Sequence, residues 1–241
     1  MSTAAIAALI DHSVLRPTAT LAELEAGCLL GRRVGAASVC VLPHFVPRAA
    51  ALLQGSPTRT STVIGFPHGG HTLWAKVREA ELALEQGATE LDAVVNVSLV
   101  SSGAWELVAD EIHALTRTCH QGGARLKLIF ETCYLSRDQK IRLCELSSAA
   151  GVDWVKTSTG FGSAGATPED VRLLREHCPA TVSVKASGGI GTLSALLEFH
   201  ELGANRIGTS RTEEILRAAA DGEAALLPSL PPSPAPGAHD R

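Results

Sequence analysis

Short apolar runs rich in β-branched residues alternate along this chain with longer segments rich in Ala, Leu and Glu. The runs recur at roughly 25–35 residues, the length of one strand–helix unit, and buried strands separated by helices form parallel sheets. Eight such units predict a single closed TIM (β/α)8 barrel with a short N-terminal helix, rather than an open doubly wound sheet. The runs expected to be strands are Ile10–Leu15, Ser38–Leu42, Thr60–Phe66, Glu90–Val97, Arg125–Glu131, Asp153–Ser158, Thr181–Ala186 and Asn205–Gly208.

Helix boundary signals fit the segments between these strands. The segment Trp74–Gly87 ends in glycine, which favours the left-handed conformation that closes helices. Leu135–Gly151 opens with an S-x-x-Q capping box at Ser136. Thr167 and Pro168 form a typical helix start, followed by two acidic residues.

The chain organisation predicts one domain and a tail. Its 241 residues fit one barrel, a fold of about 250 residues, and no linker divides them. Residues 227–241 are rich in proline and are expected to form a disordered tail, which leaves residues 1–226 as the barrel domain.

Composition narrows the class of partner. Apolar residues make up 45% of the chain and aromatic residues 4%, so small aliphatic side chains provide the packing. The formal net charge of −4 gives no indication of nucleic-acid or membrane binding, but it is compatible with a local phosphate site.

The N-terminal segment shows no targeting signature. It lacks basic residues and Asp11 interrupts its apolar run, so it is neither a signal peptide nor a membrane span. The six cysteines form no C-x-x-C pair and are expected to be reduced thiols. Together these features predict a cytoplasmic protein.

Three charged residues interrupt apolar strands where a barrel carries its active site. Asp92, Lys156 and Lys185 lie toward strand ends, and burying a charge requires a partner. A single lysine would be explained by a side chain that reaches solvent, but two at matching places on consecutive strands favour a functional site. Lys127 lies nearer a strand start, so it is either structural or a partner of Asp92 or Glu131.

Glycine-rich turns after three successive strands indicate a phosphate site. Glycine lets the backbone approach an anion closely, and a following helix N-terminus supplies free N–H groups. Arg211 is a candidate additional cation there. The residues expected to bind the substrate or its phosphate are Thr159, Gly160, Gly188, Gly189, Gly208 and Ser210.

Six motifs, in order and spacing, resemble those of the deoxyribose-phosphate aldolase family over about residues 8–216. The motifs are IDHSVL, VIGFP, ELDAVVNV, ETCYL, VKTSTGFG and VKASGGI. The resemblance implies reversible cleavage of 2-deoxy-D-ribose 5-phosphate to D-glyceraldehyde 3-phosphate and acetaldehyde. It also implies that Lys156 forms a Schiff base and that Asp92 and Lys185 transfer protons.

That assignment is physically consistent. Only a neutral amine attacks an aldehyde, and an unperturbed lysine is neutral in about one molecule in 2,500 at pH 7. Desolvation and a second ammonium from Lys185 are expected to lower the pKa of Lys156, while Asp92 keeps Lys185 charged. The iminium is the electron sink, so neither a metal nor another cofactor is expected.

Several positions depart from the family pattern. His68 and His71 form an H-G-G-H sequence without an adjacent third ligand, so we interpret them as incidental loop residues rather than a metal site. Leu42–His44 replaces a more polar turn. Cys40 is expected to line the site, and the tail contains no tyrosine.

Two alternatives remain open at this point. One is a Schiff-base aldolase of different specificity, which would keep Lys156 and the glycine turns. The other is a phosphate-binding barrel that has lost catalysis. The expected partners are a sugar phosphate and aldehydes, and a homo-oligomer (dimer or tetramer) is also expected, although no motif defines its order.

Overall fold

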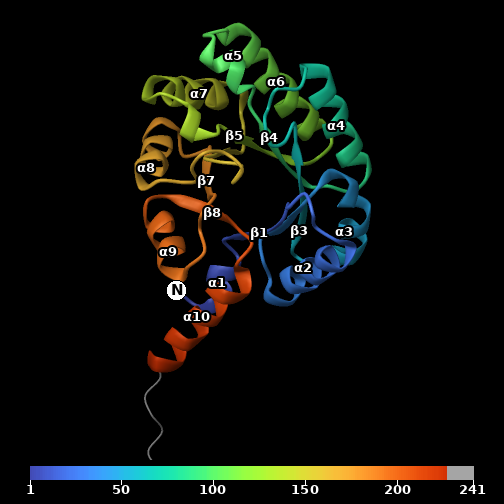
Figure 1. Cartoon of the computed structure of the whole chain (residues 1–241), viewed down its shortest axis with the longest axis vertical. Helices are drawn as coiled ribbons and strands as arrows, with labels where there is room; N and C mark the ends of the chain where they lie inside the picture. The colour runs from blue at the N-terminus through green and yellow to red at the C-terminus, as the bar shows by residue number, and fades with distance from the viewer. Residues whose placement is uncertain (227–241) are drawn as a thin grey trace, which may run out of the picture.

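In a computed structural model that describes residues 1–226, the chain forms a closed barrel of eight parallel strands with helices outside it (Figure 1). Each strand pairs with the next, and β1 closes the ring by pairing with β8. The strands are β1 Ile10–Val14, β2 Ser38–Val41, β3 Arg59–Ile64, β4 Glu90–Val94, β5 Arg125–Ile129, β6 Trp154–Lys156, β7 Ser183–Ser187 and β8 Ala204–Thr209. The predicted TIM barrel is therefore confirmed.

Helices connect successive strands, and a short helix precedes the first one as predicted. The helices are α1 Thr3–Ala7, α2 Leu21–Val34, α3 Val46–Leu53, α4 Leu73–Glu85, α5 Val97–Ser101, α6 Trp105–Gln121, α7 Arg137–Ala150, α8 Pro168–His177, α9 Leu193–Glu201 and α10 Thr212–Leu226, with 3-10 turns at Pro43–Phe45 and Thr132–Tyr134. Helices α1 and α10 pack together beside the N-terminus (Figure 1).

The predicted helix ends are largely present. Ser136 caps α7 in a capping box with Gln139, and Gly151 closes that helix in the left-handed conformation. Thr167 caps α8 by accepting a hydrogen bond from the backbone N–H of Asp170. These local interactions satisfy N–H groups that have no partner within the helix.

Strands β1 to β6 stop one to three residues earlier than expected, and after β3 and β4 the following residues adopt turn geometry. The segment predicted to continue to Val97 leaves the sheet after Val94, because the Asn96 side chain accepts from the Leu99 N–H and starts α5. Strand β3 stops at Ile64 because Gly65 follows at φ 62°, in the left-handed region.

The strands bury both of their faces, but with different side chains. In β4, Leu91 and Ala93 belong to the apolar core shared with the helices, whereas Glu90 and Asp92 form ion pairs. Side chains alternate across a strand, so the charged pair faces the inside of the barrel. The barrel interior is therefore a buried polar cluster surrounded by an aliphatic shell.

Within residues 1–226, no helix combines the length and apolar character needed to cross a membrane. All six cysteines carry free thiols. The predicted proline-rich tail, 227–241, lies outside the residues that the structure describes.

Candidate active site

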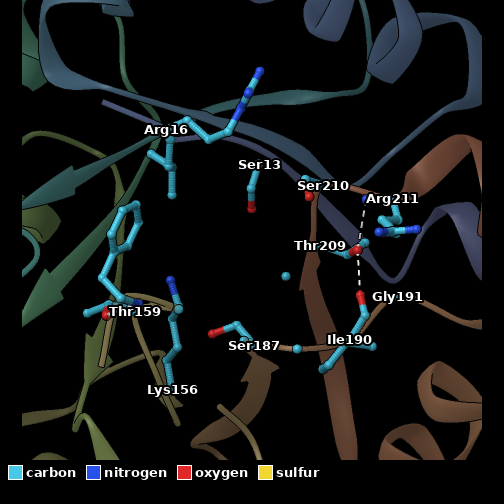
Figure 2. A pocket seen from close by; sticks show the side chains of 16 residues that line it. Ser13, Arg16, Lys156, Thr159, Ser187, Ile190, Gly191, Thr209, Ser210 and Arg211 are labelled. Carbon is cyan, nitrogen blue, oxygen red and sulfur yellow. Dashed lines mark hydrogen bonds between the residues drawn. The ribbon is translucent and has the colours of Figure 1, made fainter. Parts of the chain in front are cut away.

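A cavity of about 440 Å³ opens at the carboxyl ends of β6, β7 and β8. Figure 2 shows the Lys156 side chain rising into it between Thr159 and Ser187, with Ser210 and Arg211 on the opposite wall. The cavity thus combines one of the predicted catalytic lysines with the glycine turns, at the end of the barrel where active sites form.

Lys156 and Lys185 are register partners on adjacent strands, as predicted for the sixth and seventh strands. Both are buried, at 3% and 1% relative exposure, so neither is a surface lysine reaching solvent. Lys156 lines the cavity, whereas Lys185 lies behind it. Each Nζ lies 2.7 Å from Oδ2 of Asp92.

Asp92 joins three lysines. Its Oδ2 accepts hydrogen bonds from Lys156 and Lys185, and its Oδ1 accepts one from Lys127 at 2.7 Å. Lys127 therefore pairs with Asp92, one of the two predicted partners. The other, Glu131, instead accepts from the backbone and side chain of Thr159.

Three further charged residues complete this interior cluster and were not identified from the sequence. The Oδ2 of Asp11 lies 2.5 Å from the Nζ of Lys185, and Arg206 contacts both Asp11 and Glu90 at 2.7–2.9 Å. Glu90 also lies 2.8 Å from the Nζ of Lys127. A usable signal was present, because Glu90 stands two residues before Asp92 and so shares its face of the strand.

The charged cluster shifts the pKa values of Lys156 and Lys185 in opposite directions. Burial is the main cause that lowers the pKa of Lys156, with the charge on Lys185 adding to it against the attraction of Asp92. Burial acts on Lys185 too, but Asp11 and Asp92 outweigh it and raise the pKa of Lys185. The pKa of Asp92 is held well below its usual range, because the three neighbouring lysines outweigh the effect of its burial. Lys156 is thus the amine prepared to lose its proton.

The predicted phosphate-binding turns meet at the cavity, although their glycines serve different purposes. Gly160, Gly188 and Gly189 adopt φ values of 87°, 89° and 79°, which L side chains rarely adopt. Gly208 does not need such a φ. A Cβ there would lie 2.8 Å from the Ser187 side chain and 3.3 Å from Lys185, so glycine leaves room for both.

Polar side chains around the cavity complete its anion-binding character. Thr159 lines the wall with its hydroxyl held by Glu131, and it accepts from the Phe161 N–H. Ser210 and Arg211 are exposed and lie on the opposite wall, and Arg211 is the residue directly before α10. Ser13, which lies in β1, and Arg16, which follows that strand, also line the cavity and were not predicted (Figure 2).

The remaining singled-out residues lie elsewhere. His68 and His71 are exposed, and the described part of the chain contains no group of three His, Cys, Asp or Glu placed to hold a metal. Cys40 is near the predicted place but does not line the cavity. It is buried with Leu15 and Val63, and the charges of Asp92 and the lysines act on its thiol.

The chain resembles known aldolases over most of its length. Residues 5–210 match the model of the DeoC/LacD family aldolases. A deoxyribose-phosphate aldolase of Rhodopirellula baltica is 51% identical over 88% of each chain. One of Thermococcus kodakarensis is 44% identical over 90% of this chain and 97% of that protein.

Solved structures agree in fold. A deoxyribose phosphate aldolase from Aeropyrum pernix, described as having a unique tetrameric structure, superposes with a TM-score of 0.84 at 32% identity over 90% of this chain and 92% of that one. An aldolase called QR15 gives a TM-score of 0.87 at 35% identity, over 92% of this chain and 99% of that one.

Proposed function

The chain belongs to the DeoC/LacD family of aldolases, and we propose that it is a deoxyribose-phosphate aldolase acting through a Schiff base on Lys156. This lyase reversibly cleaves 2-deoxy-D-ribose 5-phosphate to D-glyceraldehyde 3-phosphate and acetaldehyde. The observation that carries the proposal is a buried amine of lowered pKa that opens on a cavity lined by glycine turns.

The lysine chemistry follows from this environment. In the cleavage direction, neutral Lys156 adds to the C1 aldehyde, and loss of water gives an iminium. A base removes the proton of the C3 hydroxyl, and the C3–O carbonyl of D-glyceraldehyde 3-phosphate forms as the C2–C3 bond breaks. The electron pair of that bond enters the iminium to form an enamine, and D-glyceraldehyde 3-phosphate leaves. Protonation of the enamine at C2 and hydrolysis release acetaldehyde and regenerate the amine.

Asp92 and Lys185 are the proposed proton-transfer pair for these steps. Asp92 contacts both amines at 2.7 Å and is shielded from solvent, so it holds Lys185 charged while remaining beside the reacting nitrogen. A water in the adjoining cavity would link the pair to the substrate hydroxyl and to the carbinolamine.

The phosphate of the substrate is proposed to bind at the far wall, where Gly160, Gly188, Gly189, Gly208 and Ser210 meet. The left-handed glycines leave backbone N–H groups unobstructed, and α10 starts directly after this wall. Thr159 is held by Glu131 at the side nearer Lys156, where it would contact the sugar.

The nucleophile is tested by trapping. Incubation with acetaldehyde and a borohydride reductant should add one ethyl group to Lys156, located by peptide mapping. Lys156→Arg should form no adduct and show no cleavage, because a guanidinium remains protonated. Activity should persist in a chelator, because the imine needs no metal. An unmodified wild-type chain would support a binding protein without catalysis.

The phosphate site is tested by substrate comparison. Arg211→Gln should raise KM for deoxyribose 5-phosphate by about tenfold, corresponding to about 1.4 kcal/mol of lost charge-assisted binding, and leave cleavage of free deoxyribose unchanged. Arg217→Gln, an exposed arginine on α10 outside the cavity lining, is the control. Equal cleavage of both sugars by the wild type would place the site elsewhere and favour an aldolase of different specificity.

The cellular setting and assembly are also part of the proposal. A homo-oligomer in the cytoplasm is supported by the tetrameric relative from Aeropyrum pernix and by six free thiols. Light scattering coupled to gel filtration would measure the mass in solution, and a monomer would contradict the oligomer.

A further inference from the structure

Two lysines occupy equivalent places on neighbouring strands, yet their carboxylate partners differ. Lys156 and Lys185 are direct register partners and both contact Oδ2 of Asp92 at 2.7 Å. Lys185 has a second carboxylate, Asp11, at 2.5 Å. Asp11 is therefore the group that makes two otherwise similar amines different.

The charge balance of the buried cluster also favours Lys156 as the amine that loses its proton. Its buried members are four basic groups and three carboxylates, so their charges balance when one amine has lost its proton. The exposed Arg59, 3.4 Å from Glu90, lies at the edge of the cluster. Every buried basic member except Lys156 contacts two or more of the carboxylates, so deprotonating Lys156 sacrifices the fewest ion pairs. The cluster consists of Lys127, Lys156, Lys185, Arg206, Asp11, Glu90 and Asp92.

Asp11 is held in place for this task. Its Oδ1 accepts from Arg206 at 2.7 Å, which leaves Oδ2 directed at Lys185. Arg206 is in turn fixed by two hydrogen bonds to Glu90. Asp11 is fully buried on β1, so water does not compete for its oxygens.

We infer that Asp11 is a positioning residue that selects Lys156 rather than Lys185 as the nucleophile, because it keeps Lys185 protonated. The inference rests on the proposed Schiff-base function and adds the reason why one of two adjacent amines performs it. Asp11 acts through Lys185 and does not need to touch the substrate.

The charged groups that face Lys185 support the inference that Asp11 keeps its amine protonated. Asp11 and Asp92 raise the pKa of Lys185, burial and Lys127 lower it, and the Cys40 thiol contributes a smaller rise. Lys156 is its register partner on one side and Arg206 on the other, and both are positive when protonated. Against these opposing cations, removing the charge of Asp11 should bring the pKa of Lys185 down.

The test compares four proteins: the wild type, Asp11→Asn, Lys156→Ala, and the double variant. Lys156→Ala removes the competing amine and opens Lys185 to the cavity in both proteins that carry it. Each is incubated with acetaldehyde and cyanoborohydride over a pH series, and the modified lysine is identified by peptide mapping. Asp170→Asn, which removes the carboxylate partner of Lys140 at 2.6 Å outside the barrel, is the matched control.

The expected result is a transfer of reactivity. The wild type, Asp170→Asn and Asp11→Asn should all trap acetaldehyde on Lys156 at neutral pH, because Lys185 lies behind the cavity while the Lys156 side chain is present. Lys156→Ala should modify Lys185 only at alkaline pH. The double variant should do so at neutral pH at least about tenfold faster, because each unit of pKa changes the neutral fraction about tenfold.

Two outcomes would overturn the inference. One is an equal trapping rate on Lys185 in Lys156→Ala and the double variant. The other applies even if Asp11→Asn does not fold: trapping on Lys185 of Lys156→Ala at neutral pH as fast as on wild-type Lys156. An unmodified wild type would instead contradict the proposed function itself, so the two failures are distinguishable.

Discussion

At the scale of single residues, Asp92 shows how one carboxylate serves several amines. It is fully buried and accepts hydrogen bonds from Lys127, Lys156 and Lys185. Its two oxygens divide these roles, because Oδ1 contacts Lys127 and Oδ2 contacts the two lysines nearest the cavity. A neutral amide cannot reproduce this arrangement, because it carries no charge and has only one acceptor oxygen.

Asp92→Asn should therefore separate imine formation from turnover. We expect cleavage to fall by about 10²–10⁴-fold, the usual effect of losing a positioned acid–base group, while some acetaldehyde trapping on Lys156 remains. Steady-state cleavage and trapping are measured side by side, with Asp170→Asn as the control for a lost buried carboxylate. Retention of full turnover would show that Asp92 is only structural.

Residue-level prediction worked best where the chemistry was visible along one strand. Asp92, Lys156 and Lys185 were identifiable because each places a charge in an apolar run. Asp11 and Arg206 were missed although a closed barrel was predicted, because the strand order alone does not show which side chains of β1, β7 and β8 meet inside it. The cavity-lining place expected for Cys40 was wrong, because its small side chain is buried beside Leu15 and Val63.

At the scale of elements, local sequence signals set helix ends more reliably than strand ends. The Ser136 capping box was predicted and is present. The end of β4 was placed too late, because the apolar residues after Val94 do not reveal that Asn96 begins a helix. Side-chain capping of this kind competes with strand pairing and is not visible in hydrophobicity alone.

The α7 cap gives a prediction at this scale. Ser136→Ala should lower the free energy of unfolding by about 1 kcal/mol, because the Gln139 N–H loses its side-chain acceptor. Ser136→Gly is the matched control and should cost only about a few tenths of a kcal/mol. Urea unfolding followed by circular dichroism measures both. Cleavage activity should be unchanged in both variants. If Ser136→Ala were as stable as the wild type, this capping hydrogen bond would contribute nothing to stability.

At the scale of the whole molecule, the interior carboxylates link stability to pH. The pKa values of Asp11, Glu90 and Asp92 are lowered in the folded chain, because neighbouring lysines and Arg206 outweigh burial. These groups stay ionised where an unfolded chain would take up protons, at about pH 4. Their contribution to stability is complete above that pH and is lost as the pH falls through the folded values. Glu111, whose pKa is raised by burial, acts in the opposite sense.

We therefore expect the free energy of unfolding, and with it the urea midpoint, to fall steeply between about pH 5 and pH 3. The slope of the free energy should be up to about 1.4 kcal/mol per pH unit for each carboxylate. Asp92→Asn should reduce that slope, because one titrating group is removed. Chemical unfolding at a series of pH values measures both. A midpoint independent of pH over this range would contradict the proposed balance of charges.

Closure of the ring between β1 and β8 also bears on how the protein is made. Asp11 and Lys185 are 174 positions apart, so the first emerges from the ribosome long before the second is synthesised. Until the last strand docks, Lys156 and Lys185 are ordinary ammonium groups with a pKa of about 10.4. A nascent or truncated polypeptide therefore carries no lysine activated toward cellular aldehydes, and the reactivity of Lys156 begins only with the finished molecule.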